Sequence, residues 1–151
     1  LVASAERDGM RLISVVMGTA SEESRAIETQ KLLTYGFRYY ETHKLYEPNE
    51  ILSNVRVWSG SQTAVDLGVP GEVYVTIPRG QAEAMTASLD IDEVISAPLN
   101  NGQIMGVVNV VLDNDVIYRG DVIAMQEVEL GGLLKRFIDW LTLFFSNLFG
   151  G

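Results

Sequence analysis

The sequence contains no cysteine and a single histidine, His43. Without cysteine there is no disulfide framework, no thiol nucleophile and no cysteine-ligated zinc. One histidine cannot supply a multi-histidine metal site, or a Ser-His-Asp triad without further partners. Basic residues are also few, with 11 against 20 acidic ones and a net charge of −9. A nucleic-acid partner is not expected, because neutralising phosphates needs clustered lysine and arginine.

Glycine-rich and acidic motifs of cofactor or metal sites are missing as well. No glycine run has the phosphate-loop spacing followed by lysine and a hydroxyl residue. The acidic runs Asp90–Glu93 and Asp113–Asp115 lack the glycine and the distal glutamate of an EF-hand calcium loop, and we expect turns there. The sequence therefore predicts no cofactor and no bound metal ion.

The composition that remains is globular. The chain has 151 residues, of which 47% are hydrophobic and 21% charged, a balance typical of folded domains. This length accommodates one ordinary domain or two small ones. The chain starts at Leu1 without an initiator methionine or a signal peptide, and we expect it to be an internal segment of a longer precursor.

The first 43 residues predict two strands and a long helix. Apolar runs at Leu1–Ala5 and Met10–Met17 flank the polar turn of residues 6–9, and their nearly continuous apolar character predicts strands buried on both faces. Such a hairpin needs cover from outside this chain or from later in it. An amphipathic pattern then predicts a helix over Ser21–Thr42, which makes His43 a solvent-exposed residue near the helix C-terminus, favoured by the helix dipole.

Beyond Pro48 the pattern changes to short β-branched runs separated by turn residues. Asp113-Asn114 predicts a tight two-residue hairpin, and Pro70-Gly71 and Asn101-Gly102 are further turn pairs. We expect a small antiparallel β domain, in the form of a sandwich. Its predicted strands are Val55–Trp58, Glu72–Ile77, Met85–Leu89, Glu93–Ala97, Gln103–Leu112, Asp115–Tyr118 and Val122–Val128.

Residues 133–149 predict an amphipathic helix that lies flat in a membrane surface. Lys135, Asp139, Thr142 and Ser146 form one polar stripe, and the opposite side consists of leucine, isoleucine, phenylalanine and tryptophan. Seventeen residues at about 1.5 Å each reach only ~26 Å, and the polar stripe interrupts the apolar run, which disfavours a transmembrane span. A wide apolar face with Trp140 and basic residues at one end is typical of interfacial helices.

The residues expected to bind lipid are the apolar ones of this helix, namely Leu133, Leu134, Phe137, Ile138, Trp140, Leu141, Phe144, Phe145, Leu148 and Phe149. Residues 131–151 carry a net charge of +1, so residues 1–130 carry −10. An acidic body is repelled by an anionic bilayer, so we expect the helix to hold by hydrophobicity while the body stands off the surface. The alternative is that the helix packs against the β domain or dimerises.

Three separated blocks, MRLISVVMG at Met10–Gly18, KLLTYGFRYY at Lys31–Tyr40 and VYVTIPRG at Val73–Gly80, carry a resemblance to a known family. Together with the terminal helix, they are similar to the C-terminal part of serine-type D-alanyl-D-alanine carboxypeptidases, the low-molecular-mass penicillin-binding proteins of the five and six group. The resemblance extends over essentially the whole chain.

The resemblance implies an α+β fold in three parts. Residues 1–43 correspond to the closing strands and last helix of a transpeptidase domain of the β-lactamase-like kind, residues 44–128 to a β-rich stalk domain, and residues 129–151 to a membrane anchor. It also implies a location at the periplasmic face of the inner membrane. The partners it implies are the lipid surface and, through the parent's catalytic domain, peptidoglycan pentapeptides, from which the terminal D-alanine is removed.

The catalytic motifs of the family do not occur in the sequence. Acylation needs an S-x-x-K pair, an S-x-N motif and a K-T-G strand, and none of the three is present. We therefore expect the chain to be inactive alone. Arg25 corresponds to a position near the active-site mouth, where it could bind the substrate carboxylate; a helical arginine paired with Glu22 or Glu28 is an equally good interpretation.

A second hypothesis belongs to a different class of function. The chain could be a non-catalytic envelope module that recruits a partner protein through its β domain. A large exposed apolar patch on residues 45–128 would favour that hypothesis. The sequence does not indicate an oligomeric state.

Overall fold

The computed structural model describes residues 1–149, and within the C-terminal helix it describes the side chains of residues 133–142 and 144. The chain divides into two compact units. The first comprises Leu1–Leu45 and Tyr74–Met85, and the second comprises Tyr46–Val73 and Thr86–Gly151. Residues 74–85, which the sequence assigns to the β-rich part, thus group with the N-terminal unit.

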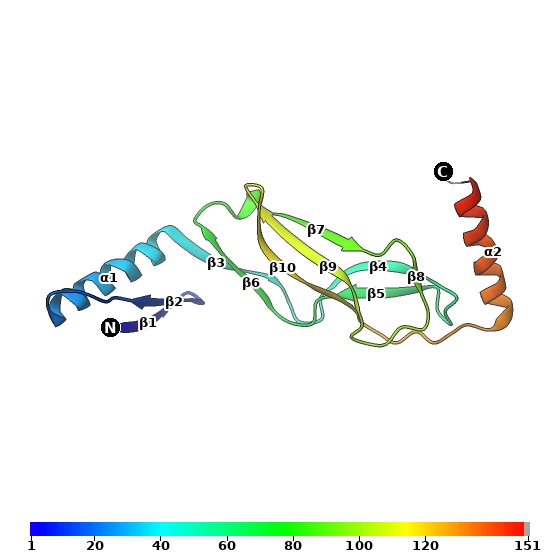
Figure 1. Cartoon of the computed structure of the whole chain (residues 1–151), viewed down its shortest axis with the longest axis horizontal. Helices are drawn as coiled ribbons and strands as arrows, with labels where there is room; N and C mark the ends of the chain where they lie inside the picture. The colour runs from blue at the N-terminus through cyan, green and yellow to red at the C-terminus, as the bar shows by residue number, and fades with distance from the viewer. Residues whose placement is uncertain (150–151) are drawn as a thin grey trace. The chain divides into compact units, whose positions relative to one another are not determined.

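The first unit begins with a hairpin followed by a helix that runs along it (Figure 1). β1 (Val2–Arg7) and β2 (Met10–Val15) are antiparallel. Asp8 and Gly9 join them with φ values of 50° and 77°, which a two-residue turn of type I′ requires. The turn is therefore shorter than expected. α1 (Glu22–Tyr39) follows.

One face of the hairpin is covered and the other is not. Met10 and Ser14 are buried on the α1 side, where a β-carbon at Gly36 would collide with the Leu12 side chain. Glycine thus lets the helix approach the strand, although it weakens a helix interior. On the opposite face, Ile13 is 69% exposed. The described chain therefore covers only one face of the hairpin, and cover of the other face from outside this chain stays a prediction.

α1 ends earlier than the sequence pattern indicated, because a distant residue satisfies its last carbonyls. The Arg79 backbone N–H donates to Tyr39 O at 2.9 Å, and its guanidinium donates to Phe37 O at 3.1 Å. Such carbonyls have no donor within the helix. The chain then continues as β3 (Tyr40–Tyr46), which pairs with β6 (Val73–Pro78). The helix predicted through Thr42 was wrong by three residues. The short helix η1 (Ala82–Ala84) follows β6.

The second unit contains one six-stranded sheet in the order β7-β9-β10-β5-β4-β8. Neighbouring strands are antiparallel except β4 and β8, which are parallel. Asp113 and Asn114, with φ values of 50° and 73°, form the predicted tight turn between β9 and β10. The strands are β4 (Ile51–Trp58), β5 (Ala64–Gly68), β7 (Thr86–Ile91), β8 (Ile95–Ser96), β9 (Ile104–Leu112) and β10 (Asp115–Ala124).

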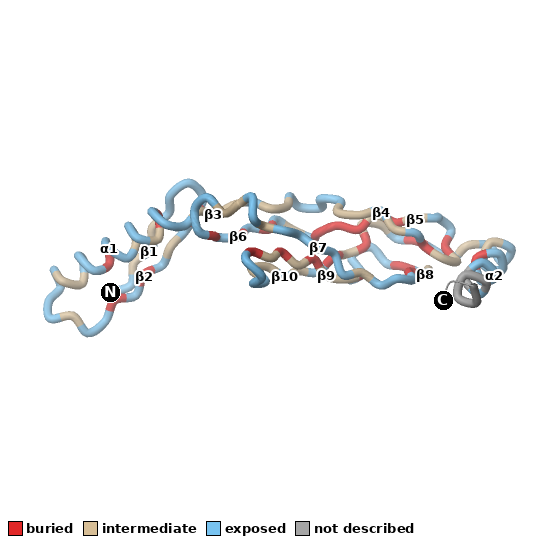
Figure 2. Tube along the Cα trace, turned by 90° about the horizontal axis from the view of Figure 1, so that it is seen from above, coloured by how far each residue is buried: buried red, intermediate tan, exposed pale blue. Residues whose placement is uncertain are grey.

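The β7-β9-β10 half and the β5-β4-β8 half of this sheet contribute to one core, and the buried residues of the strands lie mainly along β5, β9 and β10 (Figure 2). β10 joins β5 only through the pairs Ile123–Gly68 and Ala124–Leu67, whereas it pairs with β9 along most of its length. The strands of the second unit therefore belong to one hydrogen-bonded sheet that is joined at the short β10–β5 junction, and the two packed layers of the expected sandwich stay a prediction. The core residues are Val57, Val65, Leu67, Val69, Ile95, Leu99, Met105, Val108, Val122, Ala124 and Val128.

Gly68 at this junction leaves no room for a side chain. A β-carbon there would collide with the Glu50 carbonyl oxygen and lie 2.9 Å from the Met125 sulfur. Because a backbone carbonyl cannot step aside as a side chain can, Gly68→Ala is expected to lower the free energy of unfolding by about 1–3 kcal/mol. Urea denaturation followed by circular dichroism measures this. Gly71→Ala, whose β-carbon meets nothing within 4 Å, is the control; equal midpoints for the two variants would contradict the close approach.

Candidate membrane-binding helix

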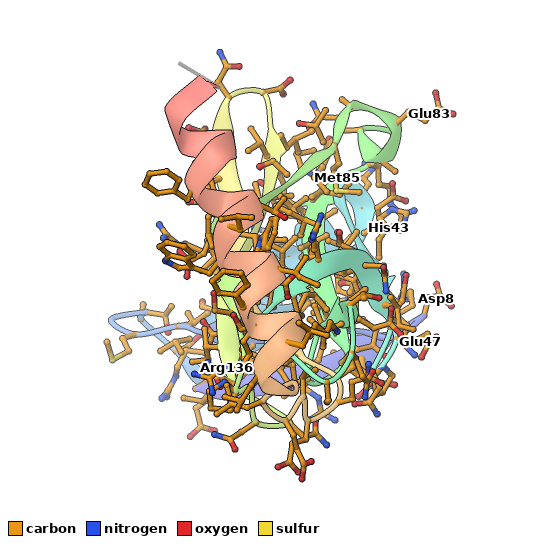
Figure 3. All side chains as sticks on the ribbon, turned by 90° about the vertical axis from the view of Figure 1, so that its right-hand side faces the viewer. Asp8, His43, Glu47, Glu83, Met85 and Arg136 are labelled. Carbon is orange, nitrogen blue, oxygen red and sulfur yellow. The ribbon has the colours of Figure 1, made fainter. Side chains whose placement is uncertain are left out.

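α2 (Leu133–Phe149) covers the same residues as the helix expected from the sequence. Figure 3 looks onto this helix, with Arg136 labelled near its first turn. Large apolar side chains are exposed along it, from 82% at Leu133 to 39% at Leu141. The expected lipid-binding residues found exposed are Leu133, Leu134, Phe137, Ile138, Trp140, Leu141 and Phe144. The side chains of Phe145, Leu148 and Phe149 lie outside the described residues.

Three aromatic rings form a row on α2. The ring centroids of Phe137 and Trp140 are 6.2 Å apart, and those of Trp140 and Phe144 are 5.7 Å apart, with interplanar angles of 28° and 21°. Residues three and four apart are neighbours on a helix surface, so the spacing in the sequence produces this row directly. Among the described residues, no helix is long and apolar enough to cross a membrane.

Asp139 is the residue of α2 that the sequence pattern misplaced. Its position in the polar stripe indicated a solvent-facing carboxylate, but the structure leaves only 7% of it exposed. Oδ2 accepts the backbone N–H of Ser59 at 2.9 Å, and Oδ1 lies 3.7 Å from Nη2 of Arg56. Arg56 in turn stacks on the Trp58 ring, with its Cζ 3.7 Å from the ring centroid. Asp139 thus faces the end of β4.

The segment that leads into α2 is hydrogen-bonded to the turn after β4. Ser61 N–H donates to Glu129 O at 2.7 Å, and Gly131 N–H donates to Ser59 O at 2.8 Å. A β-carbon at Gly131 would lie 2.6 Å from Gly60 O. Ser59 has a φ of 58°, an uncommon conformation for a residue other than glycine. Ser59 is therefore bonded twice to this part of the chain, through its C=O to Gly131 before α2 and through its N–H to Asp139 within α2.

Arg25 lies in the first turns of α1, with its Nη2 4.0 Å from Oε1 of Glu22. This contact is an i, i+3 pair in which the glutamate is 96% exposed. Exposed pairs of this kind contribute little, so Arg25 remains available to another anion. Its proposed role toward a substrate carboxylate stays a prediction.

A second polar cluster joins α1, β3 and the turn after β6 within the first unit. Glu41 accepts the Gly80 N–H at 3.0 Å and lies 3.5 Å from Nη1 of Arg79 and 3.2 Å from Nε2 of His43. Since His43 belongs to β3 and is only partly exposed, its interpretation as a solvent-exposed residue at a helix end was wrong. The Gly80 hydrogen bond first, and then His43, hold the pKa of Glu41 below its ordinary value.

This lowered pKa predicts a pH dependence. A carboxyl group whose pKa is lower in the folded than in the unfolded chain stabilises the fold above its unfolded pKa. That stabilisation is lost as the pH falls through the folded pKa. The melting temperature of Glu41→Gln should therefore lie below that of the parent chain at pH 7, and the gap should shrink towards pH 3. Glu22→Gln, at a 96% exposed side chain, is the control. A gap that is constant from pH 7 to pH 3 would contradict the assignment.

The described residues contain no group of three or more histidine, cysteine, aspartate or glutamate side chains arranged to hold a metal ion. Comparison with known proteins identifies the fold. The family model "Penicillin-binding protein 5, C-terminal domain" matches residues 40–130. The chain belongs to this family. The matched range of this penicillin-binding protein 5 domain runs from the first residue of β3 to Leu130, next to the residues that precede α2.

Relatives of this penicillin-binding protein 5 domain confirm the resemblance over the whole chain. The chain is 40% identical to the D-alanyl-D-alanine carboxypeptidase DacC and 38% identical to DacA, both of Escherichia coli, over 151 residues. The structure of penicillin-binding protein 5 from Haemophilus influenzae matches 85% of the chain, with a TM-score of 0.80 and 38% identity. The alignments with both Escherichia coli enzymes include 99% of this chain. They span only 38% of the length of each relative.

Proposed function

We propose that the chain is the C-terminal, membrane-anchoring portion of a periplasmic D-alanyl-D-alanine carboxypeptidase. Its own task is to hold the catalytic domain of the parent enzyme at the periplasmic face of the inner membrane, within reach of peptidoglycan. The parent removes the terminal D-alanine of pentapeptides through a serine acyl-enzyme. The names of the related carboxypeptidases support this activity for the parent, and S-x-x-K, S-x-N and K-T-G are absent from this sequence.

The observation that carries the anchoring proposal is the exposed apolar surface of α2. Seven large apolar side chains of this helix are more than one-third exposed. Fully burying one such side chain is worth roughly 1.5–3 kcal/mol, so several partly exposed ones on one helix provide a strong drive into the headgroup and acyl boundary. Among the described residues of the second unit, no other surface covers these seven side chains.

The exposed face of the β1–β2 hairpin supports the place of residues 1–43 in a larger domain. Val2 and Val15 are opposite each other in the register and are 68% and 56% exposed, and Ile13 lies on the same face. An apolar sheet face of this kind is normally covered by another layer. We assign that layer to the catalytic domain of the parent, which accounts for the strongly apolar sequence of the hairpin.

Flotation with liposomes tests the anchor. The 151-residue chain is expected to float with vesicles of phosphatidylcholine and phosphatidylglycerol, whereas a version that ends at Val128 stays at the bottom of the gradient. The shortened version keeps all the core residues of the β sheet, so its folding can be checked by circular dichroism. Equal partitioning of the two proteins would overturn the anchoring proposal.

Labelling with a fluorescent penicillin tests the division of labour. The product of the intact gene is expected to label, because the parent forms a serine acyl-enzyme, whereas the 151-residue chain is expected to remain unlabelled. Labelling of the 151-residue chain would show that the chain itself forms an acyl-enzyme, which contradicts this division.

The alternative, recruitment of a partner protein through the β domain, gains no support from the distribution of exposed apolar groups. The exposed large apolar side chains of residues 45–128 fall singly on separate elements. One lies on each of β4, β6, β7, the β7–β8 connection, β9 and β10; they are Ile51, Tyr74, Leu89, Val94, Ile104 and Val116. Scattered exposed apolar residues are normal on a protein surface.

A further inference from the structure

The attachment of α2 to the β sheet is polar. Among the described side chains of α2, at residues 133–142 and 144, Asp139 alone is buried. The described apolar side chains beside it are exposed, so none of these side chains makes a hydrophobic contact of comparable depth. A carboxylate is a costly group to remove from water unless charged or hydrogen-bonding partners compensate it. Burial of Asp139 therefore depends on its partners.

Those partners lie at one place, the end of β4 and the turn that follows it. The Ser59 N–H points at Oδ2 from 2.9 Å, a short charge-assisted hydrogen bond. Arg56 supplies a positive charge 3.7 Å from Oδ1, and its guanidinium is held against the Trp58 ring. These groups come from within four residues at the end of β4 and the start of the following turn. They meet a helix residue that is 80 positions from Ser59 in the sequence.

The residues just before α2 also attach the helix to the end of β4. Gly131 N–H donates to Ser59 O at 2.8 Å, so Ser59 is bonded through its C=O to the start of the segment and through its N–H to the middle of the helix. Two attachment points eight residues apart restrict both the direction of the helix and its rotation about its own axis. A single flexible linker would restrict neither.

We infer that Asp139 is a positioning residue that latches α2 to the end of β4 and fixes the orientation in which the helix presents its apolar face to a lipid bilayer. This inference rests on the proposed function. The latch consists of the Asp139 carboxylate, the Ser59 N–H and the Arg56 guanidinium. It makes the anchor a rigid extension of the β domain, so that the height and tilt of the body above the membrane are set by the protein.

The absence of cysteine in the chain makes a spin-label test direct. Ser88→Cys on β7 and Thr142→Cys on α2 give two unique labelling sites at exposed positions. Double electron–electron resonance on the full chain bound to phosphatidylcholine and phosphatidylglycerol vesicles is expected to give one narrow distance distribution. Asp139→Ala is expected to broaden that distribution at least twofold. Asp115→Ala, which removes an exposed carboxylate of the same charge, should leave it unchanged.

Two milder variants grade the effect. Asp139→Asn keeps an oxygen acceptor for the Ser59 N–H but loses its charge, and should broaden the distribution less than Asp139→Ala. Arg56→Gln removes a partner whose side chain is 57% exposed, and should broaden it least. If Asp139→Ala does not keep the thermal transition of the β domain, the two milder variants decide the test. The distance distribution of Asp139→Asn must then be broader than that of Arg56→Gln, and both must be broader than that of the parent chain. A broad distribution in the parent chain, or no broadening in the variants, would overturn the latch.

Flotation separates the latch from the anchor. The fraction of Asp139→Ala that floats with the same vesicles should differ from the parent by less than twofold, because Asp139 does not belong to the exposed apolar face. If the parent itself fails to float, the proposed function fails, and the distance distribution measured without vesicles still decides whether the latch exists. If all variants float with equally narrow distributions, the latch alone fails.

Discussion

Replacing Phe137, Trp140 and Phe144 together by serine is expected to weaken binding to vesicles by between about fortyfold and a thousandfold. Each ring is between 51% and 59% exposed in the structure, so roughly half of each side chain remains for lipid to bury. At about 1.5–3 kcal/mol for a full side chain, three half side chains contribute about 2–4.5 kcal/mol. A factor of ten in binding corresponds to about 1.4 kcal/mol, which gives the expected ratio.

Sedimentation with sucrose-loaded vesicles measures the partition coefficient, and the chain offers a matched control. Ile51, Ile104 and Val116 are 57%, 60% and 59% exposed but lie on strands of the β domain. Replacing these three by serine should change the partition coefficient by less than threefold. A comparable loss in the two triple variants would mean that lipid binding follows total exposed apolar area and has no particular site on α2.

Leu67→Ala is expected to lower the free energy of unfolding by about 2–5 kcal/mol, the range for a buried leucine whose removal leaves a cavity. Leu67 has no exposed surface, and it pairs with Ala124 where β10 meets β5. Its side chain therefore belongs to the place where the two halves of the sheet share their core. Loss of contacts there affects both halves at once.

Urea denaturation followed by circular dichroism measures this loss. Ile51→Ala, on the same sheet but at a 57% exposed position, should change the free energy of unfolding by no more than about 0.5 kcal/mol. An unchanged midpoint for Leu67→Ala would contradict the shared core and favour two separate halves.

The sequence predicted the turns and the apolar helix surface, because residues close together in the chain determine both. The Asp113-Asn114 turn was predicted because residues that tolerate positive φ stand between two apolar strands. The β1–β2 hairpin was expected for a similar reason, although its turn is tighter than the polar run suggested. The exposed apolar side chains of α2 follow from composition and helical spacing, which is why most of the expected lipid-binding residues were found exposed.

The features that the sequence did not predict depend on distant residues. α1 ends at Tyr39 because Arg79, 40 positions away, donates to its last carbonyls. β5 was not predicted, although Val65 and Leu67 alternate with Asp66 as in a half-buried strand, and both its edges are paired in the sheet. Asp139 was expected to face solvent because a helical wheel gives the side of the helix on which a residue lies. It does not show which other elements of the fold contact that side. Its partners come from β4.

Fluorescence of Trp140 tests the membrane-binding role of α2 most directly. The chain has two tryptophans, and Trp58→Phe leaves Trp140 as the only one while keeping an aromatic ring under Arg56. With vesicles that contain lipids brominated at shallow acyl positions, the account predicts a blue-shifted emission and strong quenching, because Trp140 inserts at the headgroup and acyl boundary. Emission that stays red-shifted and unquenched while the protein is saturated with vesicles would contradict it.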